Sequence, residues 1–156
     1  MSYTEVLSIP TAKETNELAN EYPFIYECPN KGRYIVKSKP LYITFRKSGG
    51  GEMEKLFGID EIIILNPKND LDTFMKDDNY STEVRERVKY YCEKIGVEKL
   101  NEEKQFFILS QENSILLPHK PKPKKRNNSY RAYYTLSYLL KGIEKGSFTD
   151  LKPSTS

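Results

Sequence analysis

Hydrophobic and polar residues alternate most regularly in the stretch PLYITFRK, residues 40–47. The odd positions carry apolar side chains and the even positions carry polar or amphipathic ones, Leu41, Ile43 and Phe45 against Tyr42, Thr44 and Arg46. Successive side chains of a strand point to opposite faces of its sheet, so this period of two predicts a β-strand.

The glycine-rich stretch SGGG, residues 48–51, predicts a turn into a second strand across residues 52–67. Gly58 interrupts that strand, as a bulge or a barrel bend would. The run IIIL, residues 62–65, is apolar at every position, which is typical of a strand end buried on both faces.

The strongest helical pattern lies in residues 81–96. Its apolar residues follow the i, i+4, i+7, i+8, i+11 spacing of one helix face, Val84, Val88, Tyr91, Cys92 and Ile95. Ser81 or Thr82 can cap the first turn, and Gly96 can end the last one. The sequence therefore predicts one main amphipathic helix here.

Shorter elements complete the pattern. Residues 11–22 and 135–142 predict two short helices, and residues 68–80 predict a polar loop with one helical turn as an alternative. A first strand is expected at a sheet edge, ended by Pro10. Runs rich in aromatic and β-branched residues predict the remaining strands, residues 4–9, 23–27, 34–37, 104–110, 113–118 and 130–135, with a short turn between the fourth and fifth of these runs.

The connections between most of these strands are too short for parallel crossovers. We therefore expect an α+β fold with a small, curved, mainly antiparallel sheet or partial β-barrel, one main amphipathic helix and two short helices. The length of 156 residues fits one domain, which we place at residues 1–146, followed by a loose tail at residues 147–156.

Composition argues for an ordered chain, because 12 Tyr and 7 Phe supply large apolar faces. No apolar run approaches the ~20 residues that cross a bilayer, and the start of the sequence lacks the pattern of a signal peptide. We expect a cytoplasmic protein without a membrane partner. Cys28 and Cys92 have no metal-ligand spacing, so both are expected to be reduced and partly buried.

Charge is unevenly distributed along the chain. Residues 51–112 hold 9 Lys/Arg and 15 Asp/Glu, whereas residues 113–143 hold 7 Lys/Arg and no acidic residue. A basic segment of this kind favours an anionic partner, although it could also face the acidic segment within the fold.

Recognisable catalytic motifs are missing from the sequence. The glycines of residues 48–51 do not have the spacing of a phosphate-binding loop, and there is no G-x-S-x-G nucleophile elbow. We expect no catalytic residue, no resident metal and no cofactor. A small metal-dependent nuclease that uses Glu52, Glu54 and Asp60 is the enzymatic alternative.

The stretch PHKPKPKKRNNSYRAYY, residues 118–134, combines cations with aromatic rings. Cations neutralise phosphates, and rings stack on unpaired bases, so the pattern predicts a non-catalytic nucleic-acid-binding surface for RNA or DNA. Its candidate residues are the cations Lys120, Lys122, Lys124, Lys125, Arg126 and Arg131, the rings Tyr130, Tyr133 and Tyr134, and two cations near the first hairpin, Arg33 and Arg46. Residues 118–128 are expected to be a loop and residues 130–134 a strand, one face of which must be core.

The segment from residue 40 to residue 65 resembles the PUA-like superfamily of EVE- and ASCH-type domains, through the element Phe57-Gly58-Ile59 and the apolar run Ile62 to Leu65 that follows it. The resemblance implies a small β-barrel flanked by helices that reads RNA or modified bases. No binding residue of that family is carried over to this chain.

A second class of function also fits the charge pattern. The acidic middle and the basic end could engage charged protein surfaces, as in a protein-interaction or regulatory module of a prokaryotic or phage conflict system.

Overall fold

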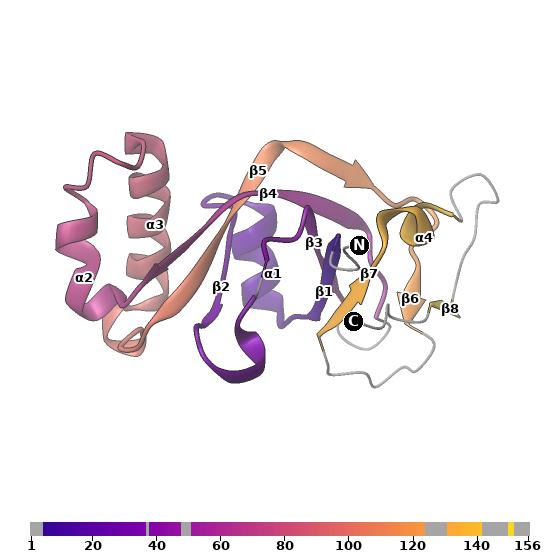
Figure 1. Cartoon of the computed structure of the whole chain (residues 1–156), viewed down its shortest axis with the longest axis horizontal. Helices are drawn as coiled ribbons and strands as arrows, with labels where there is room; N and C mark the ends of the chain where they lie inside the picture. Colours follow the sequence, from indigo (N-terminus) through magenta and orange to yellow (C-terminus); the bar gives the residue numbers. More distant parts are fainter. Residues whose placement is uncertain (1–4, 37, 48–50, 124–130, 142–149, 152–156) are drawn as a thin grey trace. The chain divides into compact units, whose positions relative to one another are not determined.

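The computed structural model describes residues 5–36, 38–47, 51–123, 131–141 and 150–151. Within them, helices accompany a six-stranded mixed sheet with the strand order β2-β5-β4-β3-β1-β7 (Figure 1). The sheet is curved and does not close into a barrel. The predicted α+β class is therefore confirmed, and the sheet is an open one.

The strands of this sheet are β1 Val6–Pro10, β2 Ile25–Pro29, β3 Tyr42–Arg46, β4 Lys55–Leu65, β5 Lys104–Leu116 and β7 Ala132–Tyr134. Two residues each form β6 Lys122–Pro123 and β8 Asp150–Leu151, which pair in a separate parallel sheet. The helices are α1 Lys13–Asn20, α2 Pro67–Phe74, α3 Thr82–Ile95 and α4 Leu136–Leu140, with 3₁₀ turns at Gly32–Tyr34 and Val97–Lys99.

The chain divides into two compact units. The first unit comprises Met1–Asn16, Ser38–Ile59 and Ser110–Ser156, and the second unit comprises Glu17–Lys37 and Asp60–Leu109. Each unit has a hydrophobic core of its own, so each is described by itself below.

In the first unit, β1 lies between β3 and β7 (Figure 1). It runs parallel to β3, with Leu7 opposite Ile43, and antiparallel to β7, with Leu7 opposite Tyr133. Side chains on the other face of β1 and β7 contribute to a core that also includes α4. The buried members of this core are Val6, Met53, Leu56, Leu117, Ala132, Tyr134 and Leu139. The expectation that the first strand lies at an edge was wrong, because Pro10 occupies its last position and leaves the preceding residues available for pairing on both sides.

In the second unit, α3 lies beside α2 (Figure 1) and supplies much of the core. Ser81 caps α3 by accepting a hydrogen bond from the backbone nitrogen of Val84 at 3.2 Å, and Gly96 follows its last turn with φ 102°. The predicted helix is confirmed, and the buried members of its stripe are Val88, Tyr91 and Cys92.

The second helix of this unit, α2, replaces a predicted loop. Asn66 precedes the helix, Pro67 stands at its first position, and the Asp70 carboxylate accepts a hydrogen bond from the Asn66 backbone nitrogen at 3.1 Å. Proline favours the first helical turn because its missing N–H would have no partner there anyway. These signals stand in the sequence, but the polar residues around them made a loop the simpler interpretation.

Residues 34–36 do not form the strand predicted at residues 34–37, and Lys37 lies outside the described residues. Gly32–Tyr34 form a 3₁₀ turn, and the side chain of Gln105 takes over the hydrogen bonding of the backbone that follows. Its Nε2 donates to the Tyr34 carbonyl at 2.6 Å, and its Oε1 accepts from the Val36 nitrogen at 3.4 Å. A side chain thus satisfies polar groups that a neighbouring strand would otherwise pair.

Residues 104–116 form the single strand β5, without the turn predicted at residues 111 and 112. Ser110 Oγ accepts hydrogen bonds from the backbone nitrogens of Glu112 and Asn113 at 3.3 and 2.9 Å. This polar side chain therefore satisfies backbone donors within the same strand. Gly58 of β4 lies against this part of β5. A Cβ atom at Gly58 would approach the carbonyl oxygen and Nδ2 of Asn113 to 2.7 Å, which explains the glycine.

Candidate nucleic-acid interface

The basic stretch begins with an ordered segment of the first unit. Leu117, His119 and Pro121 are buried, while Pro118 and Lys120 between them are exposed. The loop predicted across residues 118–128 is confirmed for residues 118–121, which form a turn anchored by buried side chains, whereas Lys122–Pro123 form β6 and residues 124–128 lie outside the described residues. Lys120 has φ 46°, in the left-handed region, and its backbone nitrogen donates to the Leu117 carbonyl at 3.0 Å.

Two backbone hydrogen bonds hold this segment against Met53 and Glu54, which directly precede β4. The Leu117 nitrogen donates to the Glu54 carbonyl at 2.8 Å, and the Met53 nitrogen donates to the Pro121 carbonyl at 2.8 Å. The His119 ring adds a contact to α4, with Nε2 2.8 Å from the carbonyl oxygen of Leu139. His119 is thus a buried packing residue and is not available as a surface base.

Two lysines converge on one carboxylate at this place. Lys47 Nζ lies 2.9 Å and Lys120 Nζ lies 3.7 Å from the same Oε1 atom of Glu54. The hydrogen bond from Lys47 is the largest cause that lowers the pKa of Glu54, and the same bond raises the pKa of Lys47. Both lysine side chains remain about half exposed, and the charge of nearby Glu52 also raises the pKa of Lys47, so two carboxylates accompany the two lysines.

Strand β7 resolves which tyrosine face is core. Tyr134 is fully buried together with Ala132, and its ring packs at 6.3 Å from the ring of Tyr138. Arg131 and Tyr133, on the other parity, are half-buried. The candidate role of Tyr134 in stacking is therefore wrong, because a ring without exposed surface cannot contact a base.

Arg46 also belongs to the core and not to the surface. Its side chain is 2% exposed, and Nη1 donates to the carbonyl oxygen of Ser8 at 2.9 Å and to Ser8 Oγ at 2.8 Å. Burial is the largest cause acting on the Arg46 guanidinium and lowers its pKa. Its predicted contact with phosphate is wrong, because the guanidinium ties β3 to β1 inside the first unit.

The remaining predicted nucleic-acid-binding residues do not all lie in one unit or among the described residues. Arg33 is exposed, with its guanidinium 5.5 Å from the centroid of the Tyr34 ring, and it belongs to the second unit, whereas the other described candidates belong to the first. Lys122 is half-buried on β6. Four candidates lie outside the described residues, Lys124, Lys125, Arg126 and Tyr130.

Sequence reasoning missed the role of Glu54 in this interface and treated it as a metal ligand of a nuclease. Two lysines now hold its carboxylate, and Asp60, its proposed partner, is exposed in the second unit. In the part of the chain that the structure describes, no three His, Cys, Asp or Glu side chains form a group that could hold a metal ion. The nuclease alternative gains no support from this geometry.

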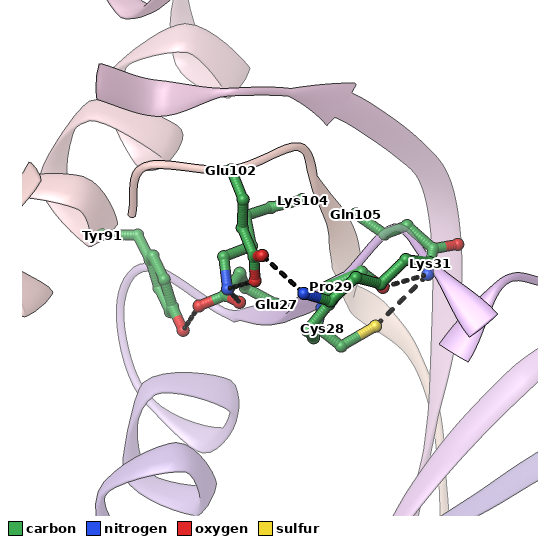
Figure 2. Close-up of polar contacts among 8 residues, drawn as sticks. All are labelled: Glu27, Cys28, Pro29, Lys31, Tyr91, Glu102, Lys104 and Gln105. Carbon is green, nitrogen blue, oxygen red and sulfur yellow. Dashed lines mark hydrogen bonds and ion pairs between the residues drawn. The ribbon is translucent and has the colours of Figure 1, made fainter. Parts of the chain in front are cut away.

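A second polar cluster lies in the second unit, where Lys104 stands between two carboxylates (Figure 2). Lys104 Nζ is 3.4 Å from Glu27 Oε2 and 3.0 Å from Glu102 Oε1, and Lys31 Nζ is 2.8 Å from Glu102 Oε2. The Tyr91 hydroxyl donates to Glu27 Oε1 at 3.1 Å. The cluster therefore ties together β2, β5 and α3.

This cluster has the character of a structural clamp and not of an active site. Burial raises the pKa of the Tyr91 hydroxyl far above its usual range, and it raises the pKa of the adjacent Cys92 thiol to about 12. A thiol with such a pKa stays protonated near neutral pH and is a poor nucleophile. Beside the clamp, Gln105 Nε2 donates to the Pro29 carbonyl at 3.1 Å and lies 3.4 Å from Cys28 Sγ (Figure 2).

No protein-family model, no curated protein and no solved structure matches this chain. Among the described helices, none has the length and apolar character needed to span a membrane.

Proposed function

We propose that the first unit is a non-catalytic nucleic-acid-binding module. The observation that carries this proposal is the convergence of Lys47 and Lys120 on a single oxygen atom of Glu54. Each ammonium group has three N–H donors, so donors remain on both lysines after the contact with Glu54. A phosphate group can accept charge-assisted hydrogen bonds from these donors.

The charge of the whole unit supports the same conclusion. The first unit carries 14 Lys/Arg and 7 Asp/Glu, a formal charge of +7, whereas the second carries 11 and 15, a formal charge of −4. Positive charge concentrated in one unit attracts polyanions and releases their counterions on binding. The segment that bears most of this charge starts from the anchored residues 117–122.

The proposed mode of binding follows from which side chains reach the surface. Lys47, Lys120, Lys122 and Arg131 contact phosphates, which positions the strand without selecting a sequence. Tyr133 offers a half-exposed ring on which one base stacks. This mode of binding agrees with the RNA recognition that the PUA-like resemblance implies, but the proposal rests on the residues of this chain.

Fluorescence anisotropy tests the proposal with a labelled 20-nucleotide single-stranded RNA, its DNA counterpart and the duplex, at 50 and 200 mM salt. The triple variant Lys47→Gln, Lys120→Gln, Lys122→Gln should bind more weakly, and the slope of log K against log salt should fall by about 2 for single strands. Tyr133→Ala should weaken binding about 5- to 100-fold while changing that slope little, because stacking is not ionic.

The matched control is the triple variant Lys76→Gln, Lys89→Gln, Lys99→Gln, which removes the same charge from exposed positions of the second unit. It should leave the affinity nearly unchanged. No binding at 50 mM salt, or an equal loss in both triple variants, would overturn the proposal.

A further inference from the structure

A pair of exposed tyrosines stands out on the second unit. The rings of Tyr22 and Tyr90 meet edge to face, with centroids 5.0 Å apart and an angle of 77° between the planes. Their exposed fractions are 47% and 42%, and the ring of Phe24 lies 6.5 Å from that of Tyr22. The proposed nucleic-acid contact uses none of these rings.

Arg87 of α3 holds the backbone that directly follows Tyr22. The Arg87 side chain is buried and donates to the carbonyl oxygens of Pro23 at 2.8 Å and Phe24 at 3.0 Å. A further bond runs from its Nη2 to the Leu109 carbonyl at 2.8 Å. Tyr90 stands one helical turn after Arg87, so the same turn of α3 holds the segment and presents the second ring.

The backbone at this segment is strained. Phe24 has φ 57°, a left-handed conformation that is unfavourable for a non-glycine residue. The bonds from Arg87 hold the backbone of Pro23 and Phe24, which directly follows Tyr22. A surface fixed in advance loses less conformational entropy when it binds a partner.

Several exposed carboxylates lie close in sequence to the aromatic pair. Glu21 precedes Tyr22 in the chain, and Glu86 and Glu93 stand one helical turn before and after Tyr90 on the exposed face of α3. Glu83 is also exposed on this helix and reaches Arg87 at 3.5 Å, while Lys89 and Lys94 are the exposed cations nearby in sequence. Because Glu83 pairs with Arg87, three carboxylates stand against the two exposed lysines, which leaves a local excess of one negative charge.

We propose that the Tyr22–Tyr90 pair docks an arginine- or lysine-bearing segment of a protein partner. A cation is attracted by the face of an aromatic ring, and arginine adds planar stacking and a hydrogen-bonding fork for carboxylates. The formal charge of −4 on this unit repels nucleic acid and favours a cationic segment. The inference is independent of the proposed function, because it concerns the other unit and the opposite sign of charge.

Isothermal titration calorimetry of the full chain with the decapeptide RGRGRGRGRG tests this inference, with the citrulline peptide of the same length as the uncharged probe. The arginine peptide should bind and the citrulline peptide should not. Tyr90→Ala and Tyr22→Ala should each weaken binding about 5-fold or more, and Glu86→Gln about 2-fold or more. Asp72→Asn removes the same charge from an exposed position of α2 and should leave binding unchanged.

Thermal unfolding of each variant confirms that it folds, and Tyr90→Phe keeps a ring and should retain at least half of the affinity. Equal weakening by Asp72→Asn and Glu86→Gln, or undiminished binding by a folded Tyr90→Ala, would overturn the inference. Analytical ultracentrifugation without peptide tests whether a second copy of the chain occupies this surface instead. Self-association that is lost in Tyr90→Ala would assign the surface to a second copy of the chain and would also overturn it.

Discussion

Arg87 donates a hydrogen bond at 3.0 Å to the carbonyl oxygen of Phe24, a residue that adopts φ 57°. The same side chain donates to the carbonyl oxygens of Pro23 and Leu109, so one guanidinium contacts three backbone acceptors of the second unit, and the Phe24 carbonyl also accepts from the Leu109 nitrogen at 3.0 Å. A helix residue therefore controls the conformation of the segment that leads into β2.

Replacement of this arginine should destabilise the protein severely. Arg87→Met keeps much of the apolar stem but removes the donor of the Pro23 and Leu109 carbonyl groups, at a cost of about 1–3 kcal/mol each, whereas the Phe24 carbonyl still accepts from the Leu109 nitrogen. We expect the free energy of unfolding, measured by urea denaturation, to fall by at least ~2 kcal/mol. Lys89→Met on the exposed face of the same helix is the control and should change it by less than ~0.5 kcal/mol. Similar values for the two variants would contradict the clamp.

Gly58 should not tolerate a side chain. Because an added Cβ would approach the carbonyl oxygen and the side chain of Asn113 to 2.7 Å, Gly58→Ala forces β4 and β5 to shift. Overpacking of this kind costs about 1–3 kcal/mol, which urea denaturation measures. Asn113→Ala in the same chain should restore only part of the loss, since the backbone carbonyl remains in place. Full restoration would show that the side chain alone sets the limit.

The hydroxyl group of Tyr134 should be dispensable although its ring is not. The ring is fully buried, while the hydroxyl oxygen is buried without a hydrogen-bond partner among the described residues. Tyr134→Ala should lower the free energy of unfolding by about 3–5 kcal/mol. Tyr134→Phe should leave it unchanged or raise it by up to ~1 kcal/mol, because an unpaired buried hydroxyl is lost. A clear loss of stability in Tyr134→Phe would reveal a bond that this account lacks.

Cys92 should be unreactive in the native protein. Burial, with the nearby negative charge of Glu27, raises the pKa of its thiol to about 12, against an ordinary value near ~8.5. The stabilising effect of the buried neutral thiol is thus fully present below pH ~8.5, and it is lost as the pH rises from there to about 12. Labelling with a thiol-specific disulfide reagent at pH 8 should require unfolding, for the buried Cys28 as well as for Cys92. Rapid labelling of the native protein would contradict this assignment.

The sequence predicted the elements whose signals are local. The alternation at residues 40–47 and the stripe that includes Val88 and Cys92 correspond to β3 and α3, because a buried face imposes its period on the chain. The strand prediction was wrong for residues 34–36 because their hydrogen-bond partner, Gln105, is remote in sequence. No local pattern indicates that a side chain will take the place of a strand.

The candidate interface was predictable only in part for the same reason. Alternation placed Arg131 and Tyr133 on one face of β7 and Tyr134 on the other, but it could not identify the buried face. Pairing with β1 and packing against α4 determine that the face with Tyr134 is the buried one. The approach of Lys47 and Lys120 to Glu54 depends on how residues 117–121 lie along β4, which composition does not reveal.

The affinity of Glu54→Gln for nucleic acid tests whether Lys47 and Lys120 bind phosphate groups. This substitution keeps the size of the side chain and removes the negative charge that Lys47 and Lys120 share. If both lysines bind phosphate, the variant should bind single-stranded RNA or DNA several-fold more tightly at 50 mM salt, with a steeper salt dependence. Asp72→Asn controls for the change in net charge and should leave the affinity nearly unaltered. An affinity of Glu54→Gln that equals or falls below that of the unmodified protein would contradict the account.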